Sequence, residues 1–370
     1  MITNLREGTV LNHNFGVETD DYLEIKVEGL ASPQSTVTVN GVLAERFDRQ
    51  FSAVIRLTQK INKITAVASD MFGDFQQTIT VVWDKKSFKR YTFFFDDCSF
   101  FMTAIAKQRP ASIFDEMFLG RLKKIHDLYG TMFILNLFYH DDHHDFSISD
   151  FPVDYKAEFA ANSDWLKLSF HAKSEFPDRP YQNATAEKLA EDYDLIYNEV
   201  CRFAGPESFI APEVIHWGMT NTDNLRVLRE RGVRCLTGGF LGSATRIGET
   251  HAVRVTDIGY HYEQDVVHHL EKARTFYDKR YDICLHFDDL CCNLSEMDKI
   301  YEIFKNIDIN KTKADTIVLM SHEQYSYSDY SSYLPDHLDR IETACRLATE
   351  AGYKCTFFSN GFLGNMSWEE

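Results

Sequence analysis

The period of the hydrophobic pattern changes once along this 370-residue chain, and that change constrains the fold more than any other feature. Residues 22 to 84 alternate apolar and polar side chains at period two, which predicts half-buried β-strands. From Tyr91 onward, short apolar runs alternate with amphipathic helical segments, which predicts a mainly parallel α/β sheet or barrel. A charged stretch at 84–90 separates the two patterns. We therefore predict two domains, a small all-β domain at 1–86 and an α/β domain at 87–370.

The first region carries further signs of a β-sandwich. Asn40 and Gly41 lie between two alternating runs, and both residue types accept the positive φ of a tight hairpin turn. Several short strands at this spacing are typical of sandwiches. The stretches Val-Thr-Val-Asn-Gly, Phe-Ser-Ala-Val-Ile-Arg-Leu and Asn-Lys-Ile-Thr-Ala-Val-Ala-Ser-Asp also resemble bacterial immunoglobulin-like modules. That resemblance covers the region up to residue 86 and implies an immunoglobulin-like fold for it.

In the second region, strands and helices are expected to alternate. The expected strands are 91–95, 132–139, 165–170, 208–211, 317–320 and 355–358. The expected helices are 112–128, 185–203, 222–231 and 336–351, of which three are followed by a glycine that ends the helix. In this class of fold, ligands bind at the carboxyl ends of the strands. The residues that follow these strands are therefore the first candidates for a functional site.

Composition excludes several classes of partner. The formal net charge of −17, with no offsetting run of Lys and Arg, opposes binding to nucleic acid or to anionic lipid. No stretch approaches the ~20 apolar residues of a membrane span, and the first residues lack a basic segment followed by an apolar one. Eight cysteines form no C-x-x-C pair, which indicates reduced thiols. A cytoplasmic protein without a signal peptide is expected, and no feature specifies its oligomeric state.

Three predicted strands end in side chains that can bind a metal or transfer a proton. The first ends in the adjacent carboxylates Asp96 and Asp97, and the second in His171, with Glu175 four residues later. The third ends in His322. One such residue alone is more often a turn or a capping side chain, but three strand ends with these groups predict a shared metal-dependent site. The polar loop 140–145 could line that site, although a solvated loop is the simpler interpretation.

The same residues, in this order and spacing, resemble the polysaccharide-deacetylase family, carbohydrate esterase family 4, over about residues 90 to 362. The family motif T-F-D-D-G is similar to Phe95-Asp96-Asp97-Cys98, and H-[ST]-x-x-H is similar to His171-Ala-Lys-Ser-Glu175. The late leucine-x-histidine motif is similar to Leu319-Met-Ser-His322. The resemblance implies a distorted (β/α) barrel in which Asp96 is the general base and His322 the general acid. It also implies that one divalent ion is held by Asp97, His171 and Glu175.

The chain departs from the family at several motif positions. Glu175 replaces a histidine, and Ala211 stands where an arginine normally orients the base. An Asp/His/Glu set binds zinc but shifts preference toward manganese, cobalt, nickel or iron. Arg179 is a candidate for the missing guanidinium. Further candidates for substrate binding follow the same strands: Tyr181, Glu213, His216 and Trp217.

The function that the resemblance implies is removal of acetyl groups from N-acetylated sugars or polysaccharide. Two alternatives stay open: a sugar-binding protein that kept the barrel but lost turnover, and an O-acetyl esterase or other C–N hydrolase with the same machinery. Retention of Asp96 and His322, which a pure binder does not need, favours the enzyme.

Overall fold

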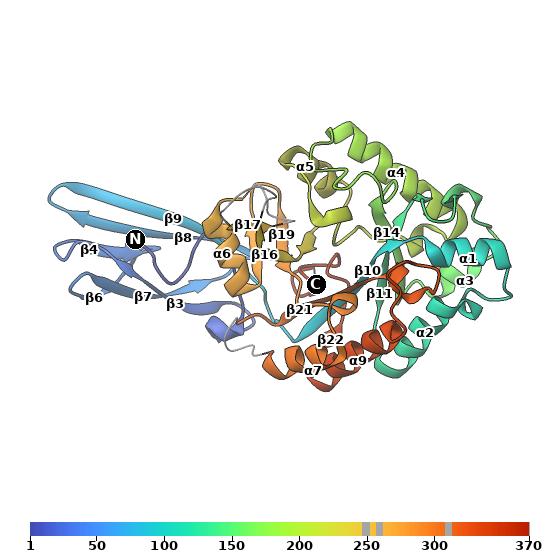
Figure 1. Ribbon diagram of the computed structural model, residues 1–370. Helices are drawn as coiled ribbons and strands as arrows, with labels where there is room; N and C mark the ends of the chain where they lie inside the picture. The colour runs from blue at the N-terminus through green and yellow to red at the C-terminus, as the bar shows by residue number, and fades with distance from the viewer. Residues whose placement is uncertain (246–251, 257–261, 308–312, 370) are drawn as a thin grey trace.

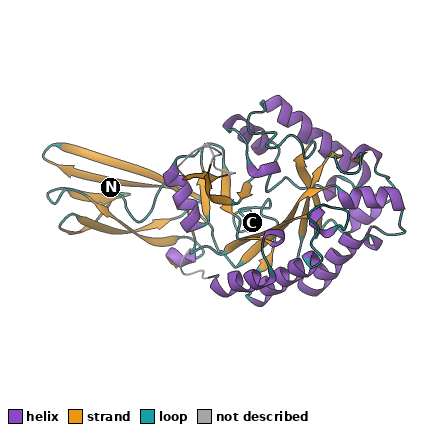
Figure 2. Cartoon of the chain, viewed as in Figure 1, coloured by secondary structure: helices purple, strands orange, loops and turns teal. Residues whose placement is uncertain are grey.

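The computed structural model describes residues 1–245, 252–256, 262–307 and 313–369 of the chain. An N-terminal region built from two β-sheets projects from one end of a larger region of mixed strands and helices (Figure 1). Figure 2 shows that all the helices drawn, apart from one short turn, lie in the larger region. The predicted α/β class is therefore confirmed for the larger region.

Two sheets make up the N-terminal region. One sheet has the order β1-β9-β8-β4-β5 and the other β2-β3-β7-β6, and every pairing is antiparallel except β1 with β9. The alternating side chains of both sheets fill one apolar core, as their period predicted. The strands are β1 (Thr9–Leu11), β2 (Gly16–Glu18), β3 (Leu23–Leu30), β4 (Thr36–Val39), β5 (Val42–Leu43), β6 (Glu45–Phe47), β7 (Gln50–Leu57), β8 (Ile61–Asp70) and β9 (Gly73–Trp83).

A parallel sheet organises the larger region. Its strand order is β14-β11-β10-β21-β20, and β22 pairs with the first residues of β10. All of these pairings are parallel, so the carboxyl ends of the strands lie at one edge. The strands are β10 (Arg90–Cys98), β11 (Phe133–Phe138), β14 (Leu166–Ala172), β20 (Leu290–Cys291), β21 (Thr316–His322) and β22 (Lys354–Cys355).

Smaller sheets complete the strands of this region. Strand β15 pairs in parallel with β19, and β18 pairs with β19 in the antiparallel sense. Two hairpins are formed by β12 with β13 and by β16 with β17. These strands are β12 (His140–Asp141), β13 (Phe146–Ser147), β15 (Cys235–Gly238), β16 (Phe240–Thr245), β17 (Ala252–Thr256), β18 (Thr275–Asp278) and β19 (Ile283–Phe287).

The helices agree with the expected positions at α4, α5 and α9, whereas α1, α3, α6 and α7 were not expected. Their bounds are α1 (Phe100–Gln108), α2 (Met117–Tyr129), α3 (Lys156–Ala161), α4 (Ala186–Phe203), α5 (Thr222–Glu230), α6 (Gln264–Ala273), α7 (Met297–Asn306) and α9 (His337–Glu350). The helix expected at 112–128 is divided into a short 3₁₀ turn and α2. The strand expected at 208–211 is wrong, because this segment makes only an isolated bridge between Leu168 and Phe209.

The parallel sheet buries both of its faces. Along β10, Tyr91, Phe93 and Phe95 pack in the core beneath the helices, whereas Phe94 packs in a second apolar cluster on the opposite face. That second cluster also receives side chains from β11, β15, β19 and β21. Strands buried on both faces need continuous apolar sequence, which explains the unbroken run of phenylalanines at 93–95.

The two regions meet in a buried polar contact. Arg90, at the start of β10, is fully buried and pairs with Asp84 at 2.8 Å, just after β9. Near the end of the chain, Asn365 donates to Asp84, and the Trp368 indole N–H donates to the carbonyl of Trp83. The charged stretch between the two patterns is thus partly interior, where it joins the regions, and does not lie free as an exposed linker.

Candidate metal site and its surroundings

The strand ends of the parallel sheet bring the predicted groups together. Asp96 and Asp97 lie at the end of β10, His171 near the end of β14, and His322 at the end of β21. His171 Nε2 lies 3.1 Å from Asp97 Oδ1, and His322 Nε2 lies 3.9 Å from Asp97 Oδ2. The expectation that three separate strand ends share one site is therefore met by the geometry.

An irregularity in β10 directs the two adjacent carboxylates. The register between β10 and β11 shifts between Phe95 and Cys98, and Asp97 has a φ of 58°. A bulge re-aims side chains at the end of a strand, and positive φ is uncommon for a residue other than glycine. Such strained backbone clusters at functional sites. Asp96 accepts a hydrogen bond from Asn136 and lies 3.7 Å from His171 Nδ1, whereas Asp97 faces His171 Nε2 at 3.1 Å.

Three side chains form a cluster with the dimensions of a metal site: Asp97, His171 and His216. His216 Nδ1 lies 3.1 Å from His171 Nε2 and 3.4 Å from Asp97 Oδ1. Ligand atoms about 2.1 Å from a divalent ion are about 3.0 Å apart at an octahedral edge and about 3.4 Å apart at a tetrahedral edge. The three separations fall in that range, so an ion fits the cluster without rearrangement of its ligands.

The protonation of the cluster also suits a metal. His216 Nε2 lies 3.0 Å from the carbonyl oxygen of Glu175, which can only accept a hydrogen bond. Nε2 therefore carries a proton, and Nδ1 is the ring nitrogen that faces the other two side chains of the cluster. Burial lowers the pKa of His171 to about 4, so the ring of His171 is neutral. Burial alone would raise the pKa of Asp97, but the hydrogen bond that it accepts from His171 Nε2–H holds that pKa below the usual range and keeps a carboxylate. A bound ion would take the place of that Nε2 proton.

Glu175 occupies a different position from the one predicted. Its carboxylate lies 2.6 Å from His143 Nε2 and 3.0 Å from Gln324 Nε2, and its main-chain carbonyl holds His216. The third group beside Asp97 and His171 is therefore His216. His216 was predicted only as a substrate contact, because it follows a segment expected to be a strand and has no ligand-like spacing to His171.

Two buried asparagines that the sequence did not mark contact the proposed proton-transfer residues. Asn136, on β11, donates through Nδ2 to Asp96 Oδ1 at 2.8 Å. Asn293 Oδ1 lies 3.0 Å from His322 Nδ1. The next residue, Glu323, accepts hydrogen bonds from the first backbone N–H groups of α1 and so fixes that helix against the end of β21.

Of the other residues predicted to contact substrate, two lie at the surface beside the site and two are buried in the protein core. Trp217 is 41% exposed next to His216, and the guanidinium of Arg179 lies 4.1 Å from the centre of its ring. Tyr181 is only 1% exposed and hydrogen bonds to Asp192. Glu213 is fully buried and accepts from Thr92 and Ser359. Tyr181 and Glu213 thus hold the fold together beneath the site, whereas Trp217 and Arg179 border it.

The polar loop after β11 packs against the site. Asp141 is buried and accepts hydrogen bonds from Thr103 and from His144 Nδ1. His144 Nε2 in turn lies 2.9 Å from Asp329. His143 contacts Glu175, so both histidines of this loop are held in place by neighbouring carboxylates.

No protein-family model and no curated protein matches this chain in sequence. Within the part of the chain that the structure describes, no helix is long and apolar enough to cross a membrane. The case for a function therefore depends on the chemistry of the site itself.

Proposed function

We propose that this protein is a metal-dependent hydrolase that removes acetyl groups from N-acetylated sugars, with one divalent ion held by Asp97, His171 and His216. The observation that carries the proposal is the 3.1–3.4 Å spacing of these three ligand atoms beside a carboxylate and an imidazole. A two-histidine, one-aspartate set suits zinc and also accepts manganese, cobalt, nickel or iron. When bound, the ion would polarise an acyl carbonyl and lower the pKa of water.

Asp96 and His322 have the placement that a base and an acid require. They are register partners on β10 and β21, and His322 Nε2 lies 3.9 Å from Asp97 Oδ2. Asp96 would take a proton from the attacking water, and His322 Nε2 would give a proton to the departing sugar nitrogen. One water is consumed, and acetate and an amino sugar are released. The two protons balance over a turnover when Asp96 returns its proton to solvent and His322 regains one.

The family and fold-family assignments belong to the same proposal. The resemblance to polysaccharide deacetylases rests on Asp96, Asp97, His171 and His322, all of which lie at the site. A barrel is supported by the second apolar cluster, the one that contains Phe94. Strands of both the parallel sheet and the β15-β19-β18 sheet contribute side chains to it. The two sheets and shared core of residues 1 to 83 support the immunoglobulin-like assignment. Trp217 and Arg179 at the rim would contact the carbohydrate.

The test is metal analysis of the purified protein followed by measurement of acetate release. The wild type should bind one divalent ion per chain and release acetate from N-acetylated amino-sugar oligomers, and His171→Ala should lose both properties. Acetate release from O-acetylated sugars alone would establish the esterase alternative. An ion bound without release from either substrate would establish the sugar-binding alternative and remove the roles given to Asp96 and His322.

A further inference from the structure

Four polar residues form a row across neighbouring strands at the carboxyl edge of the parallel sheet. Asn136 belongs to β11, Asp96 to β10 and His322 to β21, while Asn293 lies in the short 3₁₀ turn Cys292–Leu294 that follows β20. These strands are adjacent in the order β11-β10-β21-β20. The row therefore reads amide, carboxylate, imidazole, amide, and each outer amide contacts the proton-transfer residue next to it.

The contacts of Asn293 determine which atom of the His322 ring carries the proton. Asn293 lies 3.1 Å from the His322 backbone nitrogen, which can only donate, so the amide atom facing it is the oxygen Oδ1. The same oxygen lies 3.0 Å from His322 Nδ1. An oxygen of an amide only accepts, so Nδ1 must be the protonated nitrogen. Nε2, on the side of Asp97, is then the atom at which a proton is gained or lost.

The contact of Asn136 follows the same reasoning. Asp96 Oδ1 accepts, so the amide atom 2.8 Å away is the nitrogen Nδ2. This hydrogen bond fixes the rotation of the Asp96 carboxylate. Asn136 is fully buried and lies in register with Ser169 of β14, so its side chain is fixed within the sheet.

Both asparagines leave one amide atom without a partner. Among the described residues, no hydrogen bond reaches Asn136 Oδ1 or Asn293 Nδ2, although both atoms are buried. A buried unpaired polar atom destabilises the folded state, and an apolar residue of similar size would avoid that loss. Asn136 contacts Asp96, and Asn293 Oδ1 contacts His322 while it also accepts from Ser321 Oγ at 3.2 Å and from Cys291 Sγ at 3.1 Å. These bonds hold the Asn293 oxygen in place beside the His322 ring.

We propose that Asn136 and Asn293 are positioning residues for the proton-transfer pair: Asn136 orients the Asp96 carboxylate, and Asn293 holds His322 as the Nδ1-protonated tautomer. The inference rests on the proposed function. It assigns both tasks to neutral amides. Loss of either amide should change the rate of the chemical step and leave metal and substrate binding intact.

The direct test is nitrogen-15 NMR of the histidine rings in the full-length protein, with the His322 signals assigned by their loss in His322→Ala. In the wild type, Nδ1 of His322 should be the proton-bearing nitrogen, and in Asn293→Leu that preference should disappear. A wild-type ring protonated at Nε2 would overturn the inference, whether or not the protein hydrolyses acetylated sugars. This readout needs no substrate, so it is separate from the failure of the proposed function.

The second test separates kcat from KM. Asn293→Leu and Asn136→Ala should each lower kcat by about 10- to 100-fold with unchanged KM and unchanged metal content. Asn293→Asp, which keeps the acceptor oxygen, should recover most of the loss. Matched controls are Asn224→Leu, a fully buried asparagine away from the row, and Ser169→Ala, the register neighbour of Asn136. Equal loss of kcat in the controls, or a loss confined to KM, would contradict the assignment.

Discussion

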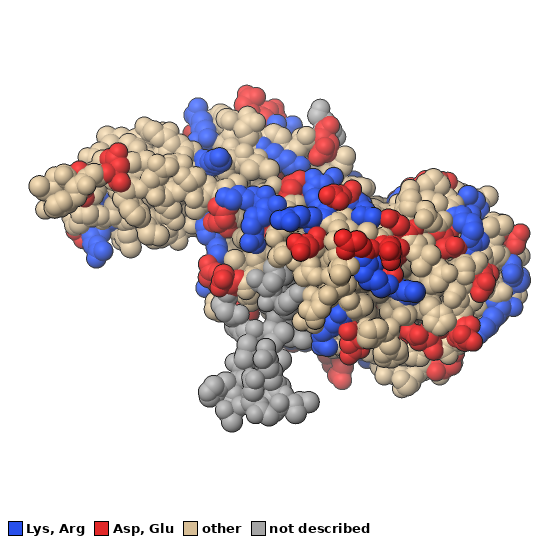
Figure 3. Space-filling model, turned by 90° about the horizontal axis from the view of Figure 1, so that it is seen from above, with Lys and Arg blue, Asp and Glu red and all other residues tan. Residues whose placement is uncertain are grey.

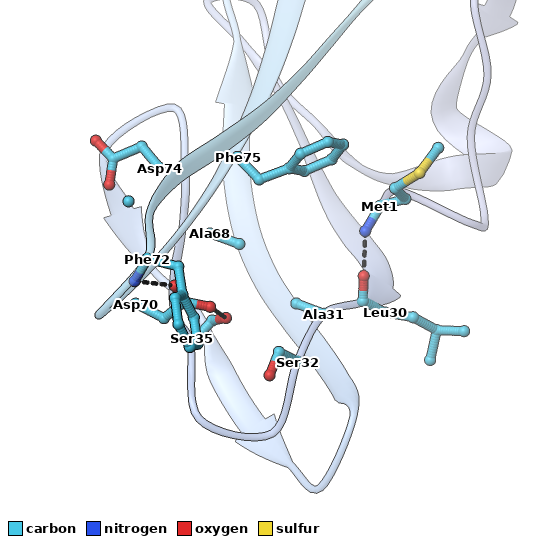
Figure 4. Close-up of a pocket in the computed structure, with 11 residues that line it drawn as sticks. Met1, Leu30, Ala31, Ser32, Ser35, Ala68, Asp70, Phe72, Asp74 and Phe75 are labelled. Carbon is cyan, nitrogen blue, oxygen red and sulfur yellow. Dashed lines mark hydrogen bonds between the residues drawn. The ribbon is translucent and has the colours of Figure 1, made fainter.

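The hollow at the far end of the N-terminal region and the strand-end site of the larger region differ in character. At the far end of the N-terminal region, a hollow of about 380 Å³ opens between the two sheets and is bordered by exposed rings, Phe72 at 88% and Phe75 at 60% (Figure 4). Its polar side chains serve the local turn, since Asp70 accepts from the Phe72 N–H and from Ser35. In Figure 3 this end is mostly uncharged on the face shown.

The strand-end site has the opposite character. Its ligand atoms come from β10, β14 and the turn at His216, and they converge to 3.1–3.4 Å while largely buried. Residues separated by 119 positions, Asp97 and His216, are in contact there. The N-terminal hollow has volume but, among the described residues, no cluster of potential metal ligands. The strand-end site is marked instead by side chains from distant parts of the chain that meet within a few ångströms.

The largest effect is expected at the buried contact that joins the N-terminal region to the larger region. Asp84→Ala removes the partner of Arg90, which is buried with almost no exposure on either side chain. Breaking a buried pair in this way costs about 3–5 kcal/mol because an uncompensated charge stays inside. We expect that loss in urea unfolding of the full chain. A protein that begins at residue 87 should lose the same unfolding free energy. A loss below about 1 kcal/mol in Asp84→Ala would mean that the N-terminal region and the larger region are stable independently of each other.

The next largest effect is a dependence of the unfolding free energy on pH, caused by Glu213 in the larger region. Burial raises the pKa of Glu213 to about 7, above its value in the unfolded chain, so the folded state favours the protonated carboxyl. The resulting stabilisation is present at acidic pH and is lost as the pH rises from about 4.5 through about 7, by up to about 3 kcal/mol. Glu213→Gln should flatten this part of the curve of unfolding free energy against pH. An unchanged curve in the variant would assign the dependence to another group.

A third prediction separates His216 from Glu175 as the metal-binding residue. His216→Ala should weaken the binding of zinc by at least about 100-fold, because a ligand is lost. Glu175→Gln is the matched control: its carboxylate contacts His143 and Gln324, so metal affinity should fall by less than about tenfold. Isothermal titration calorimetry measures both. The reverse order of effects would restore Glu175 as the ligand.

The smallest effect is expected at the hollow. Phe72→Ser replaces an exposed ring that contributes little buried area, so the unfolding free energy should change by no more than about 0.5 kcal/mol. Acetate release should stay at the wild-type level. A large loss of activity in this variant would show that the hollow takes part in the reaction. The distinction drawn between the hollow and the strand-end site would then be wrong.

The sequence was most informative where a pattern extends over many residues. Period-two alternation identified the strands of residues 22 to 84, and apolar runs ending in Asp97, His171 and His322 identified strand ends that do meet. The sequence failed where a position depends on distant backbone. His216 reaches the cluster because its Nε2 is held by the carbonyl of Glu175, and no local pattern encodes that contact. Helix α1 was missed for the same reason, since its N-terminal N–H groups are capped by Glu323.

Asn136 and Asn293 illustrate the same limit. Each is a single polar residue next to an apolar run, and such residues are usually turn or core positions. Only the strand order β11-β10-β21-β20 places them beside Asp96 and His322. Sheet order depends on contacts across the whole domain, so a residue whose role is set by it cannot be found by spacing along the chain.

The central claim is that Asp97, His171 and His216 hold one divalent ion. A crystal structure of zinc-loaded protein, with anomalous diffraction recorded on both sides of the zinc edge, tests it most directly. The account predicts a single anomalous peak about 2.0–2.2 Å from Asp97 Oδ1, His171 Nε2 and His216 Nδ1. A peak that excludes His216, or the absence of any peak at this cluster in protein that is otherwise folded, would contradict it.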